Sequence, residues 1–266
     1  MESMEQQKES QKFSDLGEKE RERYNQGFDR VAYGNFFDHC RYFYIRRRQQ
    51  LITENMEYAQ GKKVLEIGST AWKGWLEPQS IIPSSLTCIN ISEAELERGI
   101  NSAIDKKVSP EFLLMDAHNL QFEDETFDMV YGDAILHHLN LTSALDEIYR
   151  VLKPNGKICF VEPLDMNPVG KIVRALTKGA RTEDEQPLRL CDIAAIKKRF
   201  NTQFFYEEFL SVPCGVLSRM IFKNPDNSLM RFAFTADQFL DRNFALLRNW
   251  FRHTLISGTR DSTHLI

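Results

Sequence analysis

The segment from Val64 to Thr70, with the sequence VLEIGST, constrains the fold more than any other part of the chain. Val64, Leu65 and Ile67 are apolar and bulky or β-branched, a pattern typical of a buried strand. Gly68 follows at once, and a residue without a Cβ allows the backbone to turn sharply and approach a ligand. We therefore predict a buried strand that ends in a ligand-binding turn.

Short apolar strands and helices alternate along the chain after Gly61. The expected strands are 63–67, 86–91, 111–115, 127–131, 157–162, 204–212 and 253–259. Helices are expected after Ser92, over 143–152 and over 192–200. This alternation predicts a doubly wound α/β sheet that binds its ligand at the carboxyl ends of the strands. We expect a Rossmann-like sheet of seven mostly parallel strands.

The first 60 residues differ in composition from the rest of the chain. A polar, charged stretch of about 20 residues is expected to be a frayed tail. From Tyr24 to Met56, aromatic side chains alternate with arginines at spacings that suit helices. This cap is an amphipathic layer on the core, or a lid whose aromatics close over the cofactor and shape the substrate pocket, and the two alternatives are compatible. We assign 1–60 to tail and cap, and 61–266 to a ligand-binding domain with a helical insertion at about 213–252.

Charge and cysteine content exclude several classes of protein. The net charge is −4 and the pI about 5.9, which argues against a nucleic-acid binder that neutralises phosphates. The five cysteines are dispersed, without metal-ligand spacing, so we expect reduced thiols and no metal site. No apolar run approaches the roughly 20 residues of a membrane span, and the N-terminus is polar. We expect a cytoplasmic protein.

Further residues stand at regular positions after the expected strands. They are Asn90, Asp116-Ala117, Phe127-Asp128 and the run Leu152-Lys153-Pro154-Asn155-Gly156. In this order with Glu66 and Gly68, they resemble the class I S-adenosylmethionine (SAM)-dependent methyltransferases. The resemblance covers residues 61–200 closely and the remainder loosely. It implies SAM as cofactor and S-adenosylhomocysteine (SAH) as product.

The resemblance also implies a cofactor site made from the turns after the first strands. Its expected residues are Glu66, Gly68, Ser69, Thr70, Asn90, Ile91, Asp116, Ala117 and Gly132. The glycine turn would hold the methionine tail of SAM, the end of the second strand its ribose, and Asp116 its adenine. The chain departs from the family at Thr70 and Trp72, which replace glycines, and at Asn90, which replaces an acid.

Three residues after the fourth strand are candidates for catalysis. His137 and His138 lie at the mouth of the expected site, where a histidine titrating near neutral pH suits a general base. The alternative is that they pack against the structure or the cofactor. Asp133 stands where the family places groups that face the acceptor. It orients or deprotonates the acceptor, or it only caps the next helix.

Four residues are candidates for acceptor binding: Tyr33, Phe37, Trp72 and Arg181. Trp72 either walls the pocket or fills the core beneath the first helix. Arg181 belongs to a segment after Glu162 that resembles a bacterial subgroup of these methyltransferases. It either contacts a polar acceptor or forms a salt bridge that anchors a lid.

Residues 228–251 carry apolar side chains at helical spacing. Core packing or a homodimer face is one explanation, and a lid for an apolar acceptor is the other. Basic residues in this half would suit an anionic or membrane-derived acceptor.

Together these features predict a SAM-dependent methyltransferase that acts on a small molecule, with O-methylation favoured. The expected setting is secondary metabolism or the assembly of envelope glycans or lipids. The alternative is a methyltransferase-like protein that binds SAM or SAH without methylating. A nicotinamide-dependent Rossmann enzyme is disfavoured, because the sequence lacks Gly-x-Gly-x-x-Gly.

Overall fold

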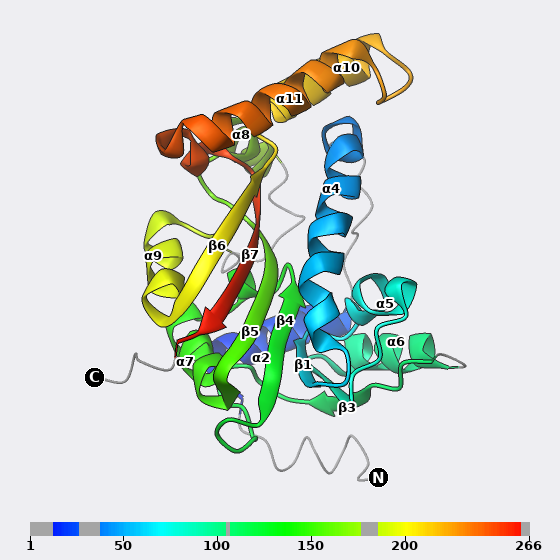
Figure 1. The fold of residues 1–266 in the computed structure, drawn as a ribbon, viewed down its shortest axis with the longest axis vertical. Helices are drawn as coiled ribbons and strands as arrows, with labels where there is room; N and C mark the ends of the chain where they lie inside the picture. The colour runs from blue at the N-terminus through cyan, green and yellow to red at the C-terminus, as the bar shows by residue number, and fades with distance from the viewer. Residues whose placement is uncertain (1–12, 27–37, 105–106, 177–185, 262–266) are drawn as a thin grey trace.

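A computed structural model describes residues 13–26, 38–104, 107–176 and 186–261. A seven-stranded sheet with the order β3-β2-β1-β4-β5-β7-β6 runs through the molecule (Figure 1). The strands are β1 (Lys63–Ile67), β2 (Ser85–Asn90), β3 (Glu111–Leu114), β4 (Phe127–Asp133), β5 (Leu152–Pro163), β6 (Phe200–Glu207) and β7 (His253–Arg260). β7 is antiparallel to both of its neighbours, and the other pairs are parallel. The predicted Rossmann-like, mostly parallel fold is confirmed.

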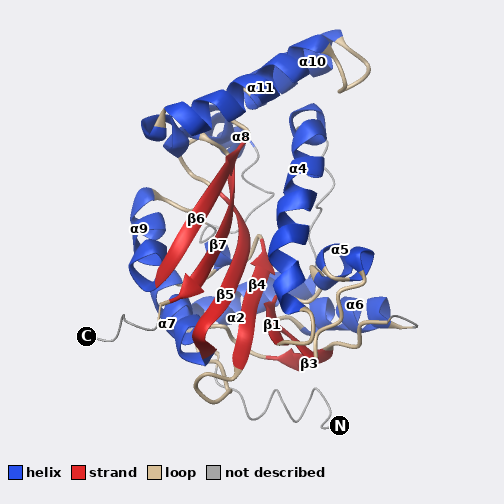
Figure 2. Ribbon diagram, in the orientation of Figure 1, coloured by secondary structure: helices blue, strands red, loops and turns tan. Residues whose placement is uncertain are grey.

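Helices cover both faces of this sheet (Figure 2). They are α2 (Asp15–Gln26), α4 (Asp38–Met56), η2 (Glu57–Ala59), α5 (Trp72–Trp75), η3 (Glu77–Gln79), α6 (Glu93–Ala103), η4 (Leu136–His138), α7 (Leu141–Val151), α8 (Pro168–Leu176), α9 (Leu190–Arg199), α10 (Ser211–Ile221), α11 (Ser228–Asn243) and η6 (Ala245–Trp250).

Alternate side chains of β1 enter the two layers of the core. Leu65 packs in one cluster with Ile148 of α7, and Val64 packs in the other with Met56 of α4. All four are buried, as expected for successive residues of a strand covered on both faces. The buried faces hold the strands in register, so their carboxyl ends meet at one edge, where the loops carry the site.

The N-terminal cap begins earlier than the sequence indicates. α2 starts at Asp15, within the stretch expected to be a frayed tail. Its Arg21 guanidinium pairs with Glu93 of α6, and Asn25 donates to the same carboxylate at 2.7 Å. These partners are some 70 residues away in the chain, so local composition could not reveal them.

The chain after β6 was expected to remain a strand to Val212, and this prediction is wrong. β6 ends at Glu207, Glu208 has a φ of 66°, and α10 begins at Ser211. The cause is distant in sequence, because the Asp237 carboxylate of α11 accepts the N–H groups of Phe209, Leu210 and Ser211. α10, α11 and η6 lie between β6 and β7, over the range for which a helical insertion is predicted.

Candidate functional site

The turn after β1 is held by a glycine and a buried carboxylate. Gly68 has a φ of 119°, and an added Cβ would meet only Glu66 Oε1, at 3.7 Å. The constraint on Gly68 is therefore conformational rather than steric. Glu66 accepts the N–H groups of Ala71 at 2.8 Å and Trp72 at 2.9 Å, and the Tyr131 hydroxyl at 2.7 Å. Glu66 thus braces the turn whose backbone faces the cavities.

A cavity of about 290 Å³ lies where the loops after β1 to β4 meet α2. Seven of the predicted cofactor residues line it: Gly68, Ser69, Thr70, Asn90, Ile91, Asp116 and Ala117. Gly132 lines neither this cavity nor the adjoining one. A Cβ there would lie 2.7 Å from the Ile67 carbonyl oxygen, so Gly132 serves close packing of the strands.

Asn90 ties the end of β2 to the turn after β1. Its Nδ2 donates to Ser69 Oγ at 3.1 Å, and its Oδ1 accepts the Ser92 N–H at 3.0 Å. Ser69 Oγ in turn donates to the Glu95 carbonyl at 3.0 Å. The amide therefore presents a neutral polar wall to the cavity where the resemblance implies a carboxylate.

Asp116 receives four hydrogen-bond donors after β3. Oδ2 accepts from the Ser14 backbone N–H at 2.9 Å and its hydroxyl at 2.8 Å. Oδ1 accepts from the His118 backbone N–H at 2.9 Å and lies 2.5 Å from Nδ1 of the same residue. Burial alone would raise the pKa of Asp116, but the bonds from His118 and Ser14 outweigh it and lower that pKa to about 2. The carboxylate is therefore ionised at neutral pH.

α2 closes the first cavity. Tyr24 belongs to the aromatics predicted to close over the cofactor, whereas Gly17 and Glu20 fall in the stretch predicted to be a frayed tail. Gly17, Glu20 and Tyr24 line the cavity from three successive turns. The Tyr24 hydroxyl lies 3.2 Å from His138 Nε2, and Glu20 Oε2 lies 3.4 Å from His138 Nδ1. His138 therefore contacts this lid. The i, i+3 and i+7 spacing of the three residues was the available signal.

Asp133 lies between the first cavity and a second one of about 350 Å³. Trp75 and the turn after β1 form much of the wall of the second cavity. The Asp133 carboxyl forms no hydrogen bond or ion pair with any described residue, and it is accessible from the cavities although protein surrounds it. This surrounding protein raises the pKa of Asp133 to about 6, while the Arg48 cation opposes the increase.

Glu162, at the end of β5, performs the capping role that was one alternative for Asp133. Its Oε1 accepts the N–H groups of Ile135 at 2.9 Å and Leu136 at 2.8 Å. Its Oε2 lies 2.8 Å from His137 Nδ1. Glu162 therefore orients the ring of His137 and satisfies the start of η4, which leaves the Asp133 carboxyl directed to the cavities.

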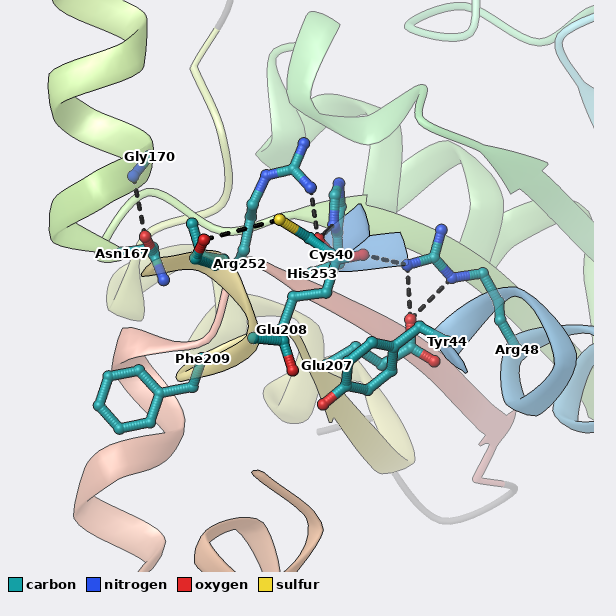
Figure 3. Close-up of polar contacts among 12 residues, drawn as sticks. Cys40, Tyr44, Arg48, Asn167, Gly170, Glu207, Glu208, Phe209, Arg252 and His253 are labelled. Atoms are coloured by element: carbon teal, nitrogen blue, oxygen red, sulfur yellow. Dashed lines mark hydrogen bonds and ion pairs between the residues drawn. The ribbon is translucent and has the colours of Figure 1, made fainter. Parts of the chain in front are cut away.

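Five ionisable side chains, three buried and two partly buried, form a charge cluster where α4 meets the ends of β6 and β7 (Figure 3). The cluster comprises Arg48 of α4, Glu207, Glu208, Arg252 and His253. Arg48 Nε and Nη2 donate to Glu207 Oε2 at 2.7 and 2.5 Å, and Nη2 lies 3.5 Å from Glu208 Oε1. Arg252 pairs with Glu208. Burial, reinforced by Arg252, lowers the pKa of His253 to about 3, so this imidazole is neutral.

The four predicted acceptor residues have different outcomes. Trp72 is completely buried in the core against α4 and lines neither cavity, which favours the core-filling alternative. Trp75, one helical turn further, stacks on Tyr131 with ring centroids 5.3 Å apart. Tyr33, Phe37 and Arg181 lie outside the described residues.

Comparison with known proteins agrees with this geometry. Residues 65–160, from β1 to β5, match the family of methyltransferase domains. This segment is a class I methyltransferase domain. The sterol 24-C-methyltransferase of Gibberella zeae is 30% identical over 145 residues, which cover 50% of this chain and 38% of that protein. The chain thus spans about two fifths of the length of this relative.

Solved structures of similar fold cover nearly the whole chain. Geranyl diphosphate C-methyltransferase from Streptomyces coelicolor A3(2) matches with a TM-score of 0.61 and 11% identity, over 93% of this chain and 99% of that one. The cyclase SpnF matches with a TM-score of 0.53 and 17% identity, over 81% of each chain. At these identities the likeness shows the fold alone. In the described residues, no helix has the length and apolarity to cross a membrane.

Proposed function

We propose that the protein transfers a methyl group from SAM to a hydroxyl group of a small molecule. The observation that carries this proposal is Asp133, a carboxyl without a protein partner among the described residues that faces both cavities. Its pKa of about 6 suits a base at neutral pH. The sterol and geranyl diphosphate methyltransferases above also act, by their names, on small molecules.

The residues of the first cavity fit SAM. The turn at Gly68 exposes backbone where no Cβ intervenes, which suits the carboxylate tail of the methionine group. Asn90 offers an amide to the ribose hydroxyls, and Asp116 would accept from the adenine amino group in place of one of the two Ser14 donors that occupy its Oδ2. When bound, SAM supplies an electrophilic methyl group on its sulfonium.

The second cavity would hold the acceptor, and Asp133 would accept the proton of its hydroxyl. Positioning of the acceptor between Trp75 and Asp133 would provide much of the rate enhancement. His137, fixed by Glu162, adds a hydrogen-bonding group near Asp133, and His138 holds α2 over the first cavity. We place the reaction in the cytoplasm, in secondary metabolism or the assembly of envelope glycans or lipids.

A screen of hydroxylated acceptors with methyl-labelled SAM tests this function. Label should pass to an oxygen of one acceptor class, with release of SAH in equal amount. Transfer to nitrogen or carbon would contradict O-methylation but would still support methyl transfer as the activity. Binding of SAM without transfer to any acceptor would favour the second candidate, a methyltransferase-like protein. The cyclase SpnF, which by its name catalyses a cyclisation, has a similar fold and supports this second candidate.

Loss of the Asp116 carboxylate should weaken SAM binding. Asp116→Ala removes a charge-assisted acceptor, so we expect a dissociation constant at least about tenfold higher by calorimetry. His137→Ala should raise the dissociation constant less, because the Nδ1 of His137 bonds to Glu162 rather than to a ligand in the first cavity. Ser14→Ala is the matched control, since it removes the hydroxyl that donates to Asp116 from just before α2 and keeps the carboxylate. Equal affinities of wild type and Asp116→Ala would refute the placement of adenine.

The pH dependence of transfer should reveal the influence of Arg48. Asp133 acts as a base only when ionised, so activity should fall below pH of about 6 in the wild type. The Arg48 cation lowers the pKa of Asp133, so Arg48→Met should raise that pKa and move the acid limb of kcat/KM to higher pH.

Two further variants isolate the charge of Arg48 from its packing. Arg48→Lys retains the cation and should keep the acid limb near its wild-type position. Glu207→Gln breaks the same ion pair but keeps Arg48, so it should not move the limb upward. If Arg48→Met and Arg48→Lys give the same pH profile, the electrostatic link to Asp133 is wrong.

A further inference from the structure

The helical insertion exposes an unusual amount of apolar surface. Of the fifteen large hydrophobic side chains exposed in the described residues, nine lie between Ser211 and Trp250. They are Leu217, Met220, Ile221, Phe222, Phe232, Phe239, Phe244, Leu246 and Trp250. We call the α10, α11 and η6 surface that carries them the insertion face. Isolated exposed apolar residues are normal, but such a concentration indicates an interaction surface.

The exposed side of α11 is apolar in addition to its buried side. Met230 and Ala233 are buried, and Phe234 stacks on Phe43 of α4 with ring centroids 5.5 Å apart. Phe232 and Phe239, two helical turns apart, are 66% and 59% exposed. The core contacts of α11 therefore do not require these two rings.

α10 shows the same division. Its Gly215 lies directly against Cys40 of α4, leaving no room for a Cβ, and Ser218 is also buried. Leu217, Met220 and Ile221 are 48%, 81% and 62% exposed. The Asp237 carboxylate holds the start of α10 against α11, so the insertion face is preformed.

The charges of the insertion are positive, in a chain whose net charge is −4. Between residues 211 and 250, the exposed ionisable side chains are all cations: Arg219, Lys223, Arg231 and Arg242. Arg219 pairs with the exposed Asp38 of α4 at 3.3 Å. Of the acids there, Asp237 is buried, and Asp226 and Asp241 are partly buried in ion pairs with Arg231 and Arg248. Figure 1 shows α10 and α11 across one end of the molecule, beyond the carboxyl end of β4.

We propose that the insertion face docks on the surface of an anionic lipid bilayer. Its aromatic and aliphatic side chains would enter the headgroup region while its cations meet the acidic lipids. A second copy fits less well, because a twofold contact pairs this positively charged face with itself. This inference goes beyond the proposed methyl transfer and does not depend on it.

Vesicle flotation of the full chain tests the proposal without SAM or acceptor. The probes are vesicles of phosphatidylcholine alone and of an equal mixture with phosphatidylglycerol. We expect clear binding to the mixture, little binding to phosphatidylcholine alone, and loss of binding at high salt. Phe232→Ser/Phe239→Ser should lower the partition coefficient at least about tenfold, since it removes two inserted rings.

The control is Ile82→Ser/Ile104→Ser, which removes two exposed side chains outside the insertion, 45% and 62% exposed. It should bind the mixed vesicles like the wild type. Arg242→Gln should lower the partition coefficient about fivefold, because one cation contributes about 1 kcal/mol near an anionic surface. Equal binding of the wild type to both kinds of vesicle, or to neither, would overturn the proposal. So would a dimer in solution that Phe232→Ser/Phe239→Ser converts to monomer.

Discussion

Asp133→Asn is expected to lower the rate of methyl transfer by about 10² to 10⁴-fold while SAM still binds. Asparagine has nearly the same shape as aspartate but cannot take the proton of a hydroxyl. The wild-type carboxyl has no other partner among the described residues that would explain its position. The measurement is single-turnover transfer of labelled methyl to the acceptor found by screening, with the SAM dissociation constant determined in parallel.

His138→Gln is the comparison for Asp133→Asn. Because His138 contacts Tyr24 and Glu20 of α2, its loss should weaken SAM binding more than it slows transfer at saturating SAM. A wild-type rate for Asp133→Asn would contradict general-base catalysis by this residue. If Asp133→Asn raises the SAM dissociation constant but leaves the rate at saturating SAM unchanged, Asp133 contacts the cofactor instead.

Gly68→Val should abolish SAM binding in the micromolar range, with a dissociation constant raised about 100-fold or more. A β-branched residue is strained at a φ of 119°, at a cost of about 1–3 kcal/mol, so the turn would change conformation. The backbone that faces the first cavity would move with it. Calorimetric titration with SAM and SAH measures the loss.

Gly61→Val is the matched control for backbone strain. Gly61 has a φ of 69° with no atom near an added Cβ, and it lines neither cavity. It should lower the melting temperature of the protein without changing the SAM dissociation constant. If Gly68→Val binds SAM like the wild type, the turn after β1 is not part of the cofactor site.

Local sequence patterns predicted the central part of the fold well. β1 has the predicted bounds, because a buried apolar run and a glycine with positive φ lie next to each other in the chain. The helix α6 begins after Ser92, whose hydroxyl accepts the Glu95 N–H as its N-cap. The family resemblance, rather than local pattern, supplied the nine cofactor candidates, and seven of them line the first cavity.

Contacts between distant residues account for what the sequence could not predict. Asp133 and Glu162 are both acids at strand ends, and only the pairing of β4 with β5 decides which one caps η4. The role of Arg48 likewise depends on Glu207, 159 residues away. The first turns of α2 could not be assigned to the first cavity because the partners of this segment, His138 and Asp116, lie about 100 residues further along the chain.

Calorimetric titration of the purified chain with SAM and with SAH tests the central proposal most directly. If the first cavity is the cofactor site, both ligands should bind with one-to-one stoichiometry and micromolar dissociation constants. Asp116→Ala should weaken both equally, because SAM and SAH share the adenine. Absence of binding by either ligand to the folded protein would contradict the proposed methyl transfer, and with it the assignment of the first cavity to SAM.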